Sequence, residues 1–227
     1  MIPHREEFNT YPSKFAPAAV FPALWVLLAG WPVGCENRGV NLSPTPAPGD
    51  LLVATAGGSD TFFDQSVVLL LDCDADGTVG LALNKLAPTP LEAVLPQWLE
   101  LVAPPRLLFA GGPVSPNGAV CLAKVARMDE DPPGWRRVVR DVGLLHLDTP
   151  VELADRGYTD LRIYAGYSGW AAGQLAEEMD RGLWYRCPAR DEDVFTAEPA
   201  GLWRRVLRRL GGSASLLSTW VPDPEVN

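Results

Sequence analysis

The sequence is poor in the residues from which metal centres are built. Only two of its 227 residues are histidine, and no two of its four cysteines form a Cys-x-x-Cys pair. Structural zinc sites take cysteine and histidine ligands at short spacings, and those spacings are missing from this chain. We therefore expect no metal site and no cofactor. The same cysteine pattern indicates a reducing compartment, so we expect the protein in the cytoplasm.

The chain also lacks an excess of positive charge and a long unbroken apolar run. Its net charge is −9 and its pI is about 4.7. Nucleic-acid binders gain most of their affinity by neutralising phosphates, so we do not expect direct nucleic-acid binding. A membrane-spanning helix needs roughly 20 consecutive apolar residues. The apolar stretch 15–34 is interrupted by Pro17, Pro22 and Pro32, so we expect no membrane span.

Residues 1–48 differ in composition from the rest of the chain, because prolines punctuate them throughout. We interpret them as a disordered N-terminal extension, or as upstream sequence translated from a misplaced start. The alternative is a lipoprotein signal in which Cys35 is lipidated, and only this alternative predicts membrane attachment. The remaining residues, 49–227, are predicted to form the domain.

Residues after 49 mix strand and helix patterns. Ser66–Leu71 is a nearly continuous apolar run, typical of a buried strand, and the turn signal Asp76-Gly77 leads into a second strand at Val79–Leu83. Leu202–Leu210 carries the apolar stripe of a helix, whereas Met128–Arg140 is polar and is predicted to be an exposed loop. These elements do not alternate regularly. We predict an α+β fold: one compact domain whose mixed, mainly antiparallel, partly barrel-like sheet is flanked by short helices.

The stretch Ile163–Glu178 changes from a strand pattern to a helix pattern. Gly166 and Gly169 separate the two, and Gly182 follows the last periodic residue of the helix. We predict a strand, a tight glycine turn and a helix whose free N–H groups face a polar or anionic group. Gly173 is predicted to let this helix approach the sheet closely.

Four sequence blocks follow one another in a characteristic order. They are Phe63–Val68, Gly80–Asn84, Gly111–Val114 and the glycine- and tryptophan-rich block from Gly166 to Trp184. In this order they resemble the AlgH/YqgE family of bacterial proteins. The resemblance implies a compact α+β fold in which these blocks lie close together. It implies no established reaction, although one family member has been described as a regulator of exopolysaccharide gene expression.

The blocks supply the candidates for a ligand cleft. These are Ser66, Asn84, Gly111, Gly112, Pro113, Tyr167, Ser168, Gly169, Trp170, Gln174 and Glu178. Gln174 and Glu178 lie one helical turn apart, so their side chains face the same way. They form either a polar wall of the cleft or a scaffold that satisfies buried backbone groups, and we favour the scaffold.

Ser168 lies in a sequence one residue away from the Gly-x-Ser-x-Gly nucleophile motif. In α/β-hydrolases the catalytic acid and histidine follow the serine, but both histidines of this chain precede it. We therefore predict no catalytic residue. The leading hypothesis is a cytoplasmic binding or regulatory protein, acting for example on transcription, with an unidentified protein or small molecule as its partner. The alternative is a hydrolase or transferase that uses Ser168, His146 or an acidic group such as Asp64.

A basic stripe runs along the last helix. Its members are Arg204, Arg205, Arg208 and Arg209. The stripe is either a contact for nucleic acid or an acidic partner, or a solvated face, and the net charge of −9 favours the solvated face.

Overall fold

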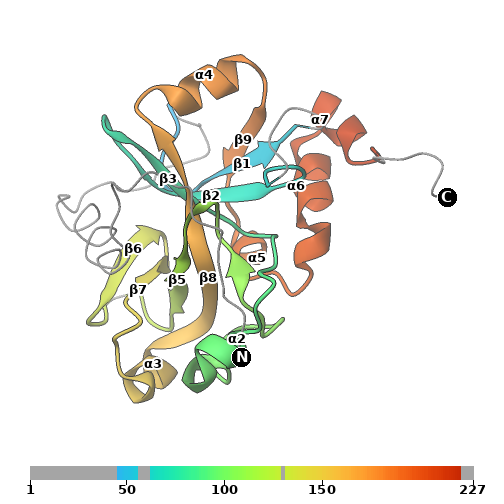
Figure 1. Cartoon of the computed structure of the whole chain (residues 1–227). Helices are drawn as coiled ribbons and strands as arrows, with labels where there is room; N and C mark the ends of the chain where they lie inside the picture. Colours follow the sequence, from blue (N-terminus) through green and yellow to red (C-terminus); the bar gives the residue numbers. More distant parts are fainter. Residues whose placement is uncertain (1–44, 56–61, 129–130, 221–227) are drawn as a thin grey trace, which may run out of the picture. The chain divides into compact units, whose positions relative to one another are not determined.

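The computed structural model describes residues 45–55, 62–128 and 131–220 (Figure 1). Residues 1–44 of the predicted extension, which include Cys35, lie outside the described residues. Among the helices of the described segments, none is long and apolar enough to cross a membrane.

In the described part of the chain, nine strands form one sheet. They are β1 (Asp50–Ala54), β2 (Val67–Cys73), β3 (Gly77–Ala82), β4 (Phe109–Ala110), β5 (Val114–Val125), β6 (Trp135–Val139), β7 (Val142–Leu145), β8 (Tyr158–Ala171) and β9 (Trp184–Pro188). Their order is β6-β7-β5-β8-β3-β2-β1-β9, and β4 pairs with β8 beside this path. Only the β4–β8 pair is parallel, so the predicted mainly antiparallel sheet is confirmed.

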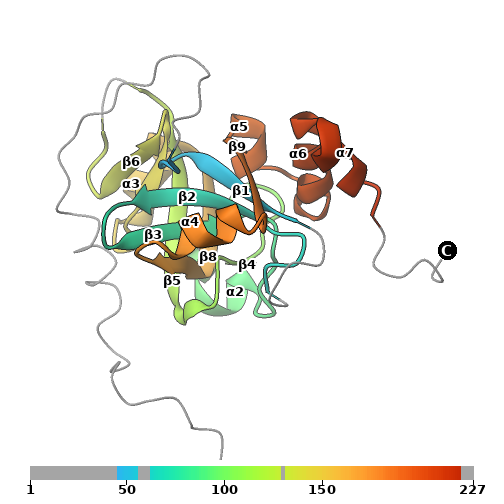
Figure 2. The ribbon, with the colours of Figure 1, turned by 90° about the horizontal axis from the view of Figure 1, so that it is seen from above.

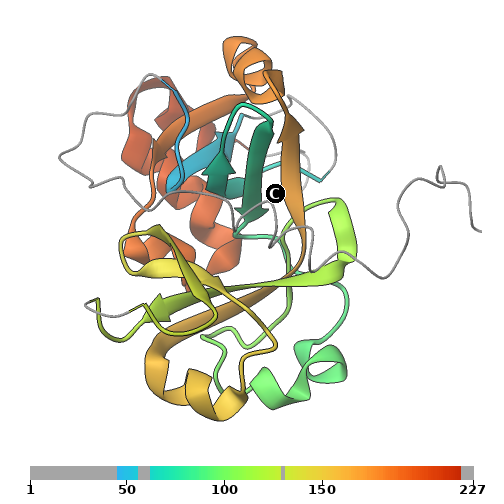
Figure 3. The same ribbon diagram turned by 90° about the vertical axis from the view of Figure 1, so that its left-hand side faces the viewer.

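The long strand β8 joins two halves of the sheet (Figure 3). Its residues from Tyr158 to Tyr167 pair with β5, and those from Ser168 to Ala171 pair with β3. Just before this change of partner, Gly166 has a φ of +67°, a left-handed conformation that favours glycine. The kink at Gly166 turns β8 from one half of the sheet into the other.

Short helices complete the α+β fold. They are α2 (Leu91–Val94), α3 (Val151–Gly157), α4 (Gln174–Asp180), α5 (Asp191–Val194), α6 (Leu202–Leu210), α7 (Gly212–Leu217) and the 3-10 turns η1 (Pro96–Trp98) and η2 (Pro199–Gly201). The predicted helix over Leu202–Leu210 is confirmed as α6. It buries Trp203 and Val206, spaced as one helix face requires, and the Trp203 indole donates to the Ala54 carbonyl of β1 at 2.8 Å.

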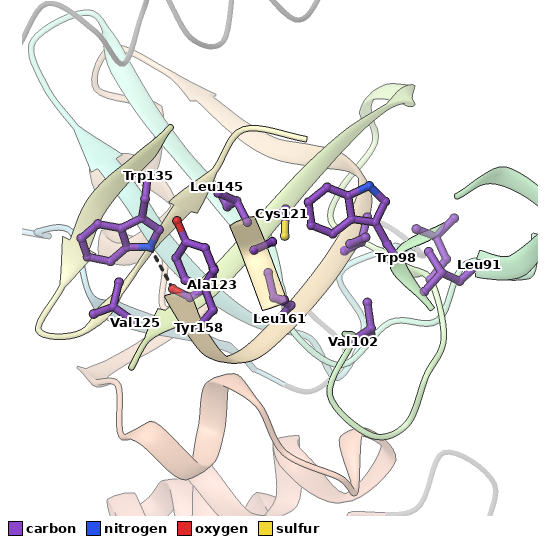
Figure 4. Packing of buried hydrophobic residues seen from close by; sticks show 13 residues of the cluster. Leu91, Trp98, Val102, Cys121, Ala123, Val125, Trp135, Leu145, Tyr158 and Leu161 are labelled. Atoms are coloured by element: carbon purple, nitrogen blue, oxygen red, sulfur yellow. Dashed lines mark hydrogen bonds between the residues drawn. The ribbon is translucent and has the colours of Figure 1, made fainter. Parts of the chain in front are cut away.

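The loop predicted for Met128–Arg140 is wrong, because β6 lies within it. Figure 4 shows the reason: Trp135 enters an apolar cluster between the strands, and its indole donates to the Ala123 carbonyl at 3.1 Å. Polar neighbours such as Arg136 and Arg137 give this segment the composition of a loop, so its sequence does not indicate a strand. The buried Trp135 side chain and the pairing with β7 hold this segment as a strand.

Candidate functional site

The first group of candidates lies at the seam where the two halves of the sheet meet. The N–H of Gly111 donates to the Ala165 carbonyl at 2.8 Å, and the Gly111 carbonyl accepts from the Ala82 N–H at 2.9 Å. A Cβ placed on Gly112 would lie 2.1 Å from the carbonyl carbon and oxygen of Tyr167. The chain therefore passes β8 in direct backbone contact, which only glycine permits, and no ligand fits between the two segments.

Ser168 belongs to this seam. Its side chain is 0% exposed, and its hydroxyl donates to the Gly111 carbonyl at 3.0 Å. A nucleophilic serine must be reached by substrate and be activated by a base within hydrogen-bond distance. His146 instead accepts at Nδ1 from the Asp148 N–H at 3.3 Å. The surroundings of Ser168 are those of a structural hydroxyl.

Asn84 and Ser66 fix the turn that precedes β2. The Asn84 side chain accepts from the Val67 N–H at 2.9 Å and donates to the Gln65 carbonyl at 2.8 Å. Ser66 is fully buried and donates to the Phe62 carbonyl at 3.2 Å. The two side chains supply hydrogen-bond partners for backbone groups of this turn. Buried backbone N–H and C=O groups need such partners. Both side chains are thus engaged within the fold.

Lys85 extends this polar cluster, since its ammonium group donates to the Asp64 carbonyl oxygen. Burial lowers the pKa of Lys85, and the attraction of the Asp64 carboxylate opposes this effect. Asp64, which the hydrolase hypothesis includes, offers its backbone carbonyl to Lys85.

The second group of candidates ties α4 to the sheet. The indole N–H groups of Trp170 and Trp184 both donate to Oε2 of Glu178, at 2.9 and 2.8 Å. The Gln174 amide donates to Oε1 of Glu178 at 2.9 Å and accepts from the Ala171 N–H at 3.1 Å. Gln174 and Glu178 therefore bind two indoles and one backbone N–H, and Gln174 itself is exposed.

The predicted glycine turn at Gly166–Gly169 is wrong. β8 continues through both glycines to Ala171, and α4 begins at Gln174. The reversal occurs at Gly173, whose φ is +79°, and nothing lies within 4 Å of a Cβ placed there. The conformation of Gly173, and not a close approach of helix and sheet, therefore explains this glycine.

Gly169 differs from the other glycines of the motif. It is exposed, lies opposite Val79 in a regular stretch of the β3–β8 ladder, and adopts no left-handed φ. A Cβ placed on it would lie 3.7 Å from side-chain atoms of both Tyr167 and Val114, an ordinary contact distance. Neither the backbone nor the packing requires glycine here. We call the surface of Val114, Tyr167 and Gly169 the platform; Val114 is 36% exposed and Pro113 beside it is also exposed.

Arg162 is a buried charge to which the sequence interpretation assigned no role. It is 0% exposed and donates to the carbonyls of Pro104, Val194 and Thr196 at 2.9, 3.1 and 2.8 Å. Its guanidinium lies 4.6 Å from the centre of the Phe109 ring. Burial lowers the pKa of Arg162. In the sequence, an arginine inside the apolar run Leu161–Tyr164 could have indicated a buried side chain that binds backbone carbonyls of distant segments.

Three arginines of the basic stripe also bind groups of the same chain, which neither interpretation anticipated. Arg204 donates to the carbonyl of Ser218, and Arg205 donates to the Thr196 hydroxyl at 2.6 Å. Arg209 forms a two-point ion pair with Asp193, at 2.9 and 2.8 Å.

As for metals, the described segments contain no group of three or more His, Cys, Asp or Glu side chains that could hold an ion.

Comparisons with known proteins agree with this architecture. A family model described as AlgH-like matches residues 51–215, which fall inside the predicted domain 49–227. A UPF0301 protein of Streptomyces avermitilis is 42% identical over 182 residues, 79% of this chain and 94% of the relative. A UPF0301 protein of Mycobacterium tuberculosis is 40% identical over 174 residues, covering 75% of this chain and 86% of the relative.

Two solved structures share the fold. A crystal structure of a protein from Corynebacterium diphtheriae matches with a TM-score of 0.74 and 28% identity, covering 79% of this chain and 95% of that one. The solution structure of the AlgH protein from Pseudomonas aeruginosa matches with a TM-score of 0.60 and 26% identity, covering 81% and 98%.

Proposed function

The chain belongs to the AlgH-like family, and we propose that it works in the cytoplasm as a binding or regulatory protein without catalytic activity. The chemically reactive candidates support this proposal by their engagement inside the fold. Ser168 is buried against Gly111, and the Glu178 carboxylate accepts from two indoles and an amide. The platform is an exposed part of the motif that a partner can reach.

Gly169 is the observation that carries the proposal. Glycine inside a strand weakens the strand, because it has no side chain to pack and more backbone entropy to lose. Such a glycine is typical of a bulge, a sharp bend or a site where a ligand or another backbone approaches closely. The β3–β8 ladder has neither a bulge nor a left-handed residue at Gly169, and no neighbour crowds it. Close approach of a binding partner is the remaining explanation.

The surroundings of Gly169 are suited to a protein partner. Tyr167 presents a half-buried aromatic ring, and Val114 presents an exposed apolar side chain on the paired strand. Aromatic side chains with an apolar body and a polar tip dominate the binding energy of many protein interfaces. A partner segment lying over Gly169 would contact both side chains.

The test uses the purified full chain and a Gly169→Leu variant, which fills the platform without touching buried groups. Ala93→Leu is the matched control, because Ala93 is exposed on α2, away from the motif. Each protein is used to capture partners from native lysate, and thermal unfolding verifies that each is folded. We expect partners retained by the wild type and by Ala93→Leu to be lost with Gly169→Leu. Retention of the same partners by all three proteins would exclude the platform as the binding surface.

A further inference from the structure

The face of β3 and β8 opposite the platform is apolar, and short segments cover it. Successive residues of a strand point to opposite faces, so Trp170 points away from the platform. With Leu52, Val68, Leu70 and Trp184 it forms a buried cluster. In the described part of the chain, this cluster packs against the turn at Phe62 and Phe63 and against Leu175 and Met179 of α4. Figure 2 shows α4 lying over β2 and β3, so this short helix is a main part of the cover.

Two side chains of α4 supply polar attachments to the sheet: Gln174 accepts from the Ala171 N–H, and Glu178 binds the indoles beneath the helix. Glu178 accepts from both indoles at a single carboxylate oxygen. The rings of Trp170 and Trp184 are 6.0 Å apart, and Phe63 lies 6.0 and 5.5 Å from them. Both tryptophans are buried, at 5% and 7% exposed. Removal of the carboxylate would leave both donors without their acceptor, and an unpaired buried donor is costly.

Both ends of α4 carry a glycine in a left-handed conformation. Gly173 precedes the helix with a φ of +79°, and Gly182 follows it with a φ of +73°. Among the described residues, nothing lies within 4 Å of a Cβ placed on either glycine, so no side chain or backbone of these segments packs against them there. Helices as short as the seven residues of α4 are not stable without tertiary contacts. The ladders of β1 with β2 and β9 do not include α4.

From these observations we propose that α4 is a hinged lid, latched by Glu178 to Trp170 and Trp184. It turns at Gly173 and Gly182 and opens separately from the sheet, which uncovers the aromatic and apolar face beneath it. Regions with few apolar contacts open locally at lower free energy than the whole domain. The inference does not depend on the proposed function, because the platform and the lid lie on opposite faces of β8.

Hydrogen exchange measured by mass spectrometry on the full chain tests the lid. We compare the wild type with Glu178→Ala and with the matched control Glu177→Ala, an exposed glutamate of the same helix. The amides of residues 174–182 should exchange roughly tenfold faster or more in Glu178→Ala, the effect of losing hydrogen bonds to a charged group. The amides of β2 should be unchanged, and Glu177→Ala should behave like the wild type.

Urea dependence in the wild type provides a test that requires no variant. Exchange through a local opening exposes little surface, so it should respond weakly to low urea, whereas β2 should respond strongly. The proposal is overturned if residues 174–182 and β2 show the same urea dependence. It is also overturned if Glu178→Ala accelerates both segments equally, since the carboxylate would then stabilise the whole domain.

Discussion

Gly112 and Gly169 both lie beside Tyr167, yet their surroundings are opposite. A Cβ on Gly112 would be 2.1 Å from the Tyr167 carbonyl group, whereas one on Gly169 would be 3.7 Å from the Tyr167 ring. Gly112 is buried and Gly169 is exposed. At the seam, glycine allows two backbones of the same chain to meet. On the platform, apart from Gly169 and its two chain neighbours, no atom of the described residues lies closer than 3.7 Å to the position that a Cβ on Gly169 would take.

The comparison separates the architectural part of the motif from its open part. At the seam, Gly111 binds Ala82, Ala165 and Ser168, so it connects β3 to both segments of β8. The platform residues take part in the ordinary ladders of β8 with β5 and β3, and Val114 and Gly169 are exposed. Substitutions at the seam should therefore alter stability first, and substitutions on the platform should alter binding first.

The largest effect is expected for Gly112→Ala. The new methyl group would collide with the backbone of Tyr167 and Ser168, which cannot move without breaking the pairing of β8. Overpacking a rigid site typically costs about 1–3 kcal/mol, and backbone collisions lie at or above the upper end. We expect a loss of about 3 kcal/mol or more in the free energy of unfolding, or failure to fold, measured by urea denaturation. A loss below about 1 kcal/mol would mean that the seam can yield.

A smaller effect is expected for Ser168→Ala. The variant loses one buried hydrogen bond, worth about 1 kcal/mol, while the Gly111 carbonyl retains the Ala82 N–H as a donor. The same variant tests the hydrolase alternative. Because the hydroxyl is buried, a serine-directed phosphonylating probe should label neither the wild type nor Ser168→Ala. Labelling that disappears with the substitution would show that Ser168 is reachable and nucleophilic.

The fold class was predictable because its strongest signals are local. The apolar run Ser66–Leu71 became β2, the segment Val79–Leu83 became β3, and the periodic helix became α6. The strand β6 was missed because its stability comes from Trp135 packing into a cluster built by distant segments. Its own sequence, rich in arginine and preceded by prolines, resembles a loop.

The candidate site was predictable as a set of neighbours but not as a surface. The family resemblance places Gly111–Val114 near Gly166–Trp170, and the structure joins them through β5 and β8. Whether a glycine is crowded or open depends on atoms from other strands, which the order of residues does not specify. The turn predicted at Gly166 and Gly169 was wrong for this reason. Gly166 has a left-handed φ, but β8 continues through both glycines, and Gly169 has an ordinary strand conformation.

The smallest effect, and the sharpest test of the comparison, is expected for Gly169→Ala. This substitution adds the same methyl group as Gly112→Ala, beside the same tyrosine, but at an ordinary contact distance of 3.7 Å from the side chains of Tyr167 and Val114. Since glycine in a strand is about 0.5–1 kcal/mol less stable than alanine, the variant should be as stable as the wild type or slightly more stable in urea denaturation. If Gly169→Ala instead destabilises the protein by more than about 1 kcal/mol, the glycine has a structural role after all. A gain in stability together with weaker retention of partners would mean that this position trades stability for binding, as functional sites commonly do.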